Sequence, residues 1–159
     1  MQRITPFLWF EQNNAEEAMN YYCSIFPNSK VVRVTRYGET GPGPAGTVMT
    51  AEFELDGQQF VGLNGGPQDK FNWAVSFVVN CETQEEVDYY WEKLSADGGE
   101  KSRCGWVKDK FGLWWQVTPT ILTETIGDKD PEKVSRVMAA MMKMDKIEIE
   151  PIKQAYEGS

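Results

Sequence analysis

Histidine is absent from this sequence of 159 residues. Its absence excludes histidine as a general base, as the partner of a serine or cysteine nucleophile, and as a metal ligand. Cysteine is scarce as well, because only Cys23, Cys81 and Cys104 occur, and they are widely scattered. An odd number of scattered cysteines does not make a disulfide framework, so we expect reduced thiols in a cytoplasmic protein.

Long apolar runs are also missing. No stretch approaches the roughly 18 apolar residues that cross a membrane. The first residues show no cationic head followed by a long apolar core, so we expect no signal peptide. Basic residues are in the minority, with 16 Lys and Arg against 24 Asp and Glu, which gives a net charge of −8. This charge disfavours nucleic acid and anionic membranes as partners.

Large apolar residues, by contrast, are plentiful. Hydrophobic residues make up 41% of the sequence and six residues are tryptophan, enough for one packed domain or two small halves that share a core. In the stretch 104–119, a charged turn at residues 108–110 separates two short strands. The second strand alternates, with Trp115 on one face and Trp114 and Gln116 on the other. Either it is a core strand with one satisfied amide, or it forms the floor of a binding cavity with Gln116 as its anchor.

One helical pattern occurs twice, at a constant offset of 69 residues. Its members are Ala18, Tyr21, Tyr22 and Ile25, and then Val87, Tyr90, Trp91 and Leu94. In each half one strand precedes the helix and three follow it, which predicts two βαβββ units at about residues 1–66 and 72–120. Side by side, two such units make an α+β fold with a curved, mostly antiparallel sheet, helices outside and a cavity inside.

A helical extension is expected over residues 121–159. Asp130-Pro131 and Glu150-Pro151 are typical helix starts, with the acidic residue before the first turn and proline in it. The apolar stripe of the first of these helices is rich in methionine, a soft and adaptable side chain. Two readings stay open for this stripe: it packs on its own domain, or it covers a partner subunit.

The glycine-rich segment 38–46 contains glycines with the spacing of a dinucleotide-binding turn. Pro42 and Pro44 remove two of the backbone amides that such a turn offers to phosphate. The segment that follows alternates like a strand, whereas the dinucleotide motif requires a helix. We therefore expect a mobile loop that lies over a pocket.

A series of short motifs carries a family resemblance. In order they are ITPFLWF, EEA with Tyr22, RYGE, GPGPAG, LNGGP, EEVDYYW, CGW, KDKFG and WQ, within a match from Ile4 to about Tyr156. The sequence resembles the PhnB-like branch of the vicinal oxygen chelate superfamily, often labelled demethylubiquinone methyltransferase-like. This resemblance implies the two-unit fold and a homodimer. It says less about activity, because the fold hosts lyases, dioxygenases, thiol transferases and drug-sequestering proteins.

The resemblance also implies where a metal would bind. The metal enzymes of the superfamily place His and Glu ligands on the first and last strands of each repeat. The matching positions here hold Ile4 or a neighbour, Asn64, Ala74 or Ser76, and Gln116. None of these side chains is a good ligand for a divalent metal, so we expect no metal and no cofactor.

The resulting hypothesis is a protein that binds a small, partly aromatic organic molecule without a metal. The expected ligand-binding residues are Asn64 and Gln116 as polar anchors, Trp9, Trp106 and Trp115 as walls, and Arg36 beside the loop. Arg36 has the alternative of being an ordinary surface residue. Two other functions stay open. One is an enzyme of the superfamily, as a metal-dependent lyase or oxygenase or as the methyltransferase of the family label. The other is an interaction module that uses the methionine-rich extension.

Overall fold

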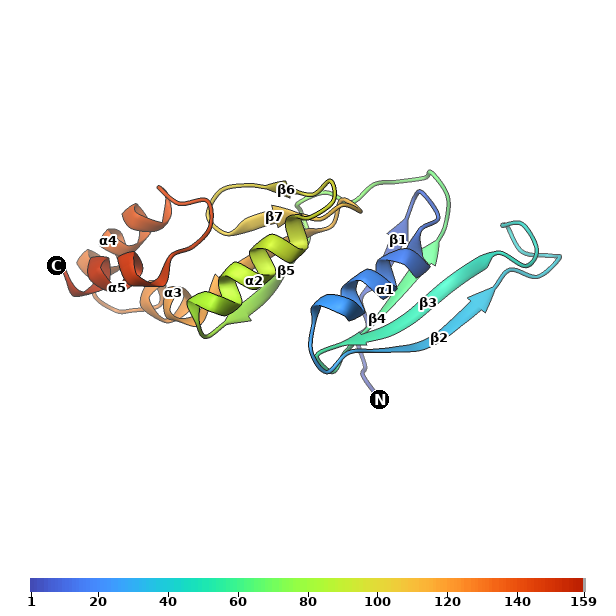
Figure 1. The fold of residues 1–159 in the computed structure, drawn as a ribbon, viewed down its shortest axis with the longest axis horizontal. Coiled ribbons are helices and arrows are strands. Elements are labelled where there is room, and N and C mark those ends of the chain that lie inside the picture. The colour runs from blue at the N-terminus through green and yellow to red at the C-terminus, as the bar shows by residue number, and fades with distance from the viewer. Residues whose placement is uncertain (159) are drawn as a thin grey trace. The chain divides into compact units, whose positions relative to one another are not determined.

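The computed structural model describes residues 1–158, and its elements follow one order twice (Figure 1). The first unit, Met1–Phe71, contains β1 (Phe7–Phe10), α1 (Ala15–Ile25), β2 (Lys30–Arg36), β3 (Val48–Leu55) and β4 (Gln58–Asn64). The second unit, from Asn72 onward, contains β5 (Ser76–Cys81), α2 (Gln84–Ser95), β6 (Glu100–Lys101), β7 (Trp106–Lys108) and β8 (Trp114–Pro119). It continues with α3 (Thr120–Ile126), α4 (Pro131–Met141) and α5 (Ile149–Glu157). The expected α+β fold of two βαβββ units with a C-terminal helical extension is confirmed.

Each unit builds a four-stranded sheet with the same strand order. The orders are β1-β4-β3-β2 and β5-β8-β7-β6, and only the pairs β1–β4 and β5–β8 are parallel, so both sheets are mostly antiparallel. The parallel strand pairs show which residues occupy equivalent positions in the two units. Trp9 pairs with Leu63 in the first sheet, and Val78 pairs with Gln116 at the equivalent place in the second.

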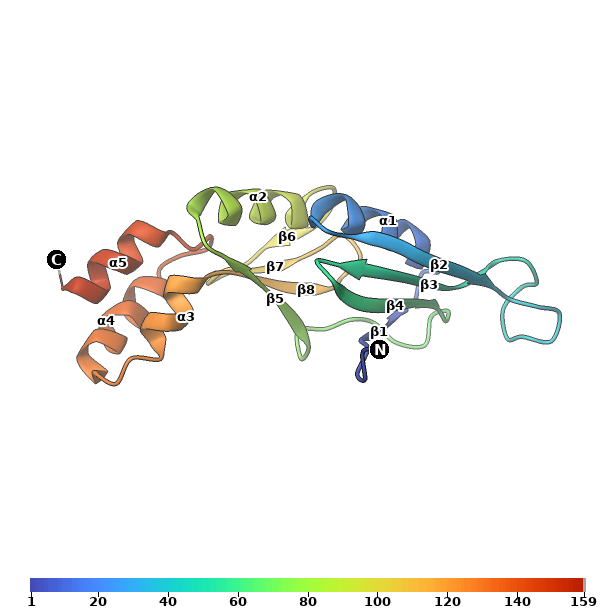
Figure 2. The same cartoon turned by 90° about the horizontal axis from the view of Figure 1, so that it is seen from below.

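Each sheet is covered by a helix of its own unit on one face only (Figure 2). The buried residues of the repeated pattern line these helices: Ala18, Tyr22 and Ile25 in α1, and Val87, Trp91 and Leu94 in α2. Because side chains alternate along a strand, every second strand residue packs under the helix. We call this side the helix-covered face of a unit, and the opposite side, which no helix of the same unit covers, its open face.

The turn between β7 and β8 is organised by a buried carboxylate. Asp109 lies in the charged turn expected from the sequence, but its side chain is buried, with the residue only 1% exposed. Its Oδ1 accepts hydrogen bonds from the backbone N–H of Phe111 at 2.9 Å and of Leu113 at 3.1 Å. Its Oδ2 accepts a bond from Trp115 Nε1 at 2.8 Å. Three donors thus compensate the cost of removing this charge from water and fix the start of β8.

The C-terminal extension packs on its own unit. Its core consists of Leu122 of α3, Val137 of α4, Ile152 of α5 and Ile147, which lies in the connection before α5. Backbone hydrogen bonds from Cys104 N to Met144 O and from Gly105 N to Asp145 O tie the α4–α5 connection to the turn before β7. Val137 and Met141 of the methionine-rich stripe thus pack within the chain, whereas Met142 is 62% exposed.

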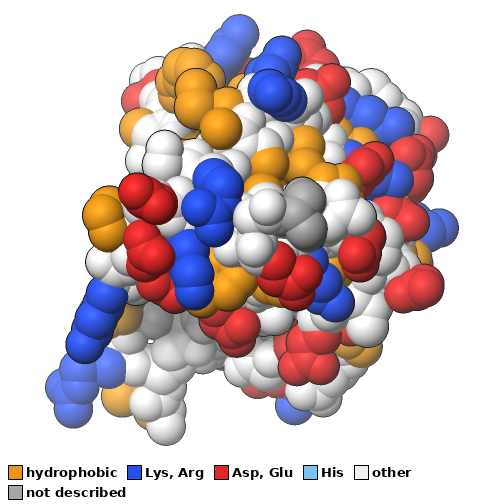
Figure 3. Space-filling model, turned by 90° about the vertical axis from the view of Figure 1, so that its left-hand side faces the viewer, with side chains coloured by type: hydrophobic (Ala, Val, Ile, Leu, Met, Phe, Trp, Pro, Cys, Tyr) orange, Lys and Arg blue, Asp and Glu red, His pale blue; other side chains and the backbone are white. Residues whose placement is uncertain are grey.

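The surface of the extension is mixed in charge. Figure 3 views the molecule from the side of the extension and shows acidic and basic side chains interspersed. Within residues 1–158, no helix has the length and apolar character needed to span a bilayer.

Replacing Asp109 by alanine tests the role of the buried carboxylate. Asp109→Ala leaves Trp115 Nε1 and two backbone N–H groups without their acceptor. We expect the free energy of unfolding to fall by about 2–4 kcal/mol, measured by urea denaturation. Asp69→Ala, in an exposed loop, is the control and should change stability by less than about 0.5 kcal/mol. Equal stability of the two variants would contradict the proposed role.

Candidate functional site

The open face of the second unit carries a polar pair at its centre. Gln116 of β8 donates a hydrogen bond from Nε2 to Ser76 Oγ of β5 at 3.0 Å, and both side chains are partly buried. Among residues 1–158, no donor reaches Gln116 Oε1 within hydrogen-bond distance. The Ser76 hydroxyl keeps its own hydrogen to donate. The pair therefore offers one acceptor and one donor side by side.

Three indole rings surround this pair. Trp106 of β7 lies opposite Gln116 in the strand register, and Trp114 lies opposite Ser76. The Trp114 ring is 6.3 Å from that of Trp106 and 6.0 Å from that of Trp73, whose side chain is 68% exposed. The resulting surface is aromatic with a polar centre, the composition typical of sites for small organic molecules.

Trp73, Trp114 and Ser76 were not among the expected ligand-binding residues. The signal for Trp114 was present in the sequence, because alternation along β8 placed it on the same face as Gln116. Trp73 precedes the strand in an irregular segment, where no period indicates a direction. A ring in such a segment can be assigned to a face only from the folded structure.

Trp115 lies on the other face of the same strand. It is 3% exposed, its ring lies 5.7 Å from that of Phe77, and its Nε1 binds Asp109. These contacts belong to the core under α2. The structure therefore places Trp115 away from the face that holds Gln116 and Trp106.

Asn64 lies on the helix-covered face of the first unit. Its Oδ1 accepts a hydrogen bond from Ala15 N at 2.8 Å, at the first residue of α1, and its Nδ2 donates to Val48 O at 3.2 Å. Its carbonyl oxygen accepts a hydrogen bond from the Tyr37 hydroxyl. The amide of Asn64 thus links the start of a helix to the start of β3, and the structure does not place it at a position equivalent to Gln116.

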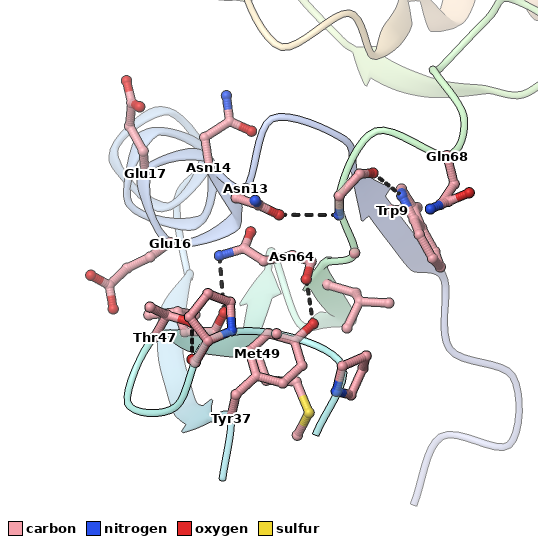
Figure 4. A pocket seen from close by; sticks show the side chains of 17 residues that line it. Trp9, Asn13, Asn14, Glu16, Glu17, Tyr37, Thr47, Met49, Asn64 and Gln68 are labelled. Carbon is pink, nitrogen blue, oxygen red and sulfur yellow. Dashed lines mark hydrogen bonds between the residues drawn. The ribbon is translucent and has the colours of Figure 1, made fainter. Parts of the chain in front are cut away.

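Trp9 and Arg36 lie at different places on the first unit. Trp9 is on the open face and donates from Nε1 to Gly66 O at 2.8 Å. It lines, together with Asn64, a concavity of about 920 Å³ (Figure 4). Arg36 is exposed and donates from Nη1 to Gly46 O at 3.2 Å, so it braces the base of the glycine-rich loop.

The donor atoms of these sites do not suit a divalent metal. Of the positions where the resemblance implies metal ligands, Ala74 or Ser76 and Gln116 lie in the second unit, and all three side chains are neutral. Divalent metals bind best to carboxylates, imidazoles and thiolates. Within residues 1–158 no group of three or more Cys, Asp or Glu side chains is arranged to hold a metal ion.

Two of the three cysteines, Cys23 and Cys81, are poor candidates for a nucleophile. All three are free. Burial raises the pKa of the Cys81 thiol to about 12, with a further contribution from the charge of Glu86. Burial also raises the pKa of Cys23 above its usual value. A thiol reacts as its thiolate, so these shifts reduce the reactivity of both groups at neutral pH.

Thiol titration tests this assignment. At pH 8 the Cys81 thiol stays protonated because its pKa of about 12 lies far above the solution pH. We expect an aromatic disulfide reagent to label at most Cys23 and Cys104 in the folded protein, and the third thiol only after denaturation. Rapid reaction of three thiols in the native state would contradict the prediction.

Comparison with known proteins agrees with the family resemblance expected from the sequence motifs. The family described as 3-demethylubiquinone-9 3-methyltransferase matches residues 2–118. A putative 3-demethylubiquinone-9 3-methyltransferase, the PhnB protein from Bacillus cereus, is 42% identical, with 74% of this chain and 99% of that chain covered and a TM-score of 0.67. The family match ends before Tyr156, to which the resemblance was expected to extend, so the extension from α3 to α5 lies outside it. No curated protein sequence matches this chain.

More distant structures share the fold alone. Protein PA1353 from Pseudomonas aeruginosa is 20% identical, with a TM-score of 0.62 over 75% of this chain and 98% of that chain. The fosfomycin resistance protein FosX from Listeria monocytogenes is 17% identical, with a TM-score of 0.55 over 80% of this chain and 98% of that chain.

Proposed function

The chain belongs to the 3-demethylubiquinone-9 3-methyltransferase family, and from this premise we propose that it binds a small, partly aromatic organic molecule without a metal. The proposed site is the open face of the second unit. One observation carries the proposal: the Ser76–Gln116 pair keeps an unused acceptor at the centre of an indole-lined surface. A polar pair of this kind orients a ligand, and the surrounding rings supply most of its contact area.

The chemistry of the pair defines the ligand class. Gln116 Oε1 needs a donor, and the Ser76 hydroxyl needs an acceptor. A flat ring that carries a hydroxyl group beside a carbonyl group meets both needs at once. Stacking of such a ring on Trp106 or Trp114 adds about 0.5–1.5 kcal/mol per aromatic pair beyond the burial of area.

A methyltransferase is the second candidate, favoured by the family description and by the name of the Bacillus cereus relative. Methyl transfer would require a methyl donor to bind beside the acceptor molecule. The glycine-rich loop 38–46 leads into β3, so it does not offer a helix N-terminus to a nucleotide. Calorimetry with S-adenosylmethionine separates the two candidates, because tight binding of that donor would favour the enzyme and contradict simple ligand binding.

Replacing Gln116 tests the polar anchor directly. The probe is 2-hydroxyacetophenone, a flat phenol with adjacent hydroxyl and carbonyl groups that stays neutral at pH 7, and its binding is measured by isothermal titration calorimetry. Gln116→Leu should weaken binding by roughly ten- to a hundredfold, because one buried hydrogen bond is worth ~1–3 kcal/mol. Gln58→Leu, at an exposed position of β4, is the matched control and should bind like the parent.

Two results would overturn the proposal. One is unchanged affinity in Gln116→Leu. The other is probe binding that disappears with a strong chelator and returns with zinc, nickel or manganese. Such a result would restore a metal-dependent function in spite of the neutral donor set.

We also propose that the protein is a homodimer. Large apolar side chains remain exposed on the open faces, including Phe7 in the first unit and Val78 in the second, where Val78 is 49% exposed. A second copy of the chain would bury such surfaces with closed symmetry. The three free cysteines are also in keeping with the reducing cytoplasm that we propose as its location.

Light scattering tests the dimer. At micromolar protein we expect about twice the mass of one chain, which is 18.1 kDa. Val78→Asp should shift the mass toward one chain, because a charge on the open face opposes burial. A mass near 18.1 kDa for the parent protein would rule the dimer out.

A further inference from the structure

The turn between β6 and β7 leads directly into a ring of the proposed site. Cys104 and Gly105 at its centre both have positive φ angles, of 57° and 84°. Trp106 N donates a hydrogen bond to Arg103 O at 3.0 Å, which closes a turn of type I′. β6 has two residues and β7 has three, so few ladder hydrogen bonds hold this hairpin together. Because Trp106 is the first residue after the turn, the position of its indole depends on what holds the turn in place.

The connection between α4 and α5 holds this turn from outside the sheet (Figure 1). We call this connection, residues 142–148, the strap. Both N–H groups at the centre of the turn donate to it. The bond from Cys104 N to Met144 O measures 2.9 Å. The bond from Gly105 N to Asp145 O measures 2.7 Å. Such a pair of backbone hydrogen bonds restrains the turn in the way that a neighbouring strand would.

Arg103 adds side-chain contacts between the turn and the strap. Its Nη2 donates a hydrogen bond to Met142 O at 2.6 Å, and its Nε lies 3.3 Å from Asp145 Oδ1. The ion pair with Asp145 is exposed to solvent and therefore weak, whereas the bond to Met142 O is directional. Arg103 is thus a side chain through which the contact between turn and strap can be altered without touching the backbone hydrogen bonds.

Gln84, the first residue of α2, anchors the other end of the strap. Its Nε2 donates to Ile147 O at 3.2 Å, and its Oε1 accepts a hydrogen bond from Ile149 N at 2.8 Å. Ile147 is fully buried in the core of the extension. It also lies next to the turn, because a Cβ atom at Gly105 would come within 3.1 Å of Ile147 Cγ1. The strap is therefore fixed both to a helix and to a core, and it restrains the turn through them.

We propose that the C-terminal extension positions the Trp106 wall of the ligand site through the strap. A ring held in advance loses little conformational freedom when a ligand stacks on it, so this support favours binding. Arg103 and Gln84 are positioning residues, since they act through Trp106 and not on the ligand. The family match ends at residue 118, so the support comes from a part of the chain outside that match. The ligand part of this inference rests on the proposed function, whereas the support of the turn does not.

Hydrogen exchange of the ligand-free full chain tests the support of the turn. Arg103→Ala and Gln84→Met each remove side-chain hydrogen bonds to the strap. We expect the Cys104 and Gly105 amides to exchange about two- to tenfold faster in both variants, because losing a hydrogen bond of ordinary strength favours local opening by about this factor. Exchange is followed by NMR, and urea denaturation verifies that each variant is folded.

Each variant has a matched control. Gln2→Met removes an amide that also binds one backbone carbonyl and one backbone N–H, both of Gln59, but it lies in the first unit. Lys101→Ala removes a cation of the same hairpin whose ion-pair partner is Glu92 of α2 and not the strap. Both controls should leave the exchange of the two turn amides as it is in the parent. Equal exchange in the variants and in their controls would overturn the proposal.

Two further measurements report on the ligand site. In the chain labelled with 5-fluorotryptophan, the fluorine NMR signal of Trp106 is the one that Trp106→Phe removes. We expect Arg103→Ala and Gln84→Met to shift or broaden this signal, and to bind 2-hydroxyacetophenone about three- to tenfold more weakly than the parent. An unchanged fluorine signal, or unchanged affinity for a probe that the parent binds, would overturn the positioning role. A parent chain that does not bind the probe would contradict the proposed function, and the exchange rates and the fluorine signal would still decide whether the strap positions Trp106.

Discussion

One helix per sheet is the constraint from which the rest of this structure follows. A four-stranded sheet has two faces, and α1 and α2 each cover one of them within their own unit (Figure 2). The strands alternate accordingly, with buried apolar side chains under the helix and a different set on the open face. In the second unit that set includes Trp73, Trp114 and Gln116, which is not the composition of an ordinary solvated face. The open faces are therefore the surfaces on which a ligand or a second subunit gains most by binding.

The polar residues of the two units differ in how many of their side-chain donor and acceptor atoms have a hydrogen-bond partner. Asp109 and Asn64 are buried, and their side-chain atoms bind backbone groups that begin β8, α1 and β3. Such residues stabilise connections, because a buried polar group without partners costs free energy. Gln116 uses its Nε2 for Ser76 and keeps its Oε1 at a partly buried position. This unused acceptor at a partly buried position sets Gln116 apart from Asp109 and Asn64 and supports its proposed role as a ligand anchor.

The sequence predicted the elements well because their signals are local. The helical stripes became the buried faces of α1 and α2, and Asp56-Gly57, a dipeptide typical of two-residue hairpins, forms the turn between β3 and β4 with φ angles of 48° and 83°. Helix α3 gave no such signal, since it follows β8 directly and Pro119 provides no side-chain cap. The side of the sheet to which a strand residue points was harder to predict than the helices and strands themselves. Asn64 was paired with Gln116 as an anchor, but the register aligns it with Val117, on the helix-covered side.

Neutral side chains at positions where the resemblance implies metal ligands would change which molecules this fold can bind. A bound divalent cation attracts anionic or chelating oxygen ligands and polarises them. Ser76 and Gln116 carry no charge, so they favour a ligand that donates one hydrogen bond and accepts another. The indoles around them favour a flat ring over a flexible chain, because a rigid ring loses little entropy when it stacks. Fold and family membership therefore do not decide the activity, and the neutral donor and acceptor on this face are the feature on which the proposed recognition of a neutral aromatic molecule depends.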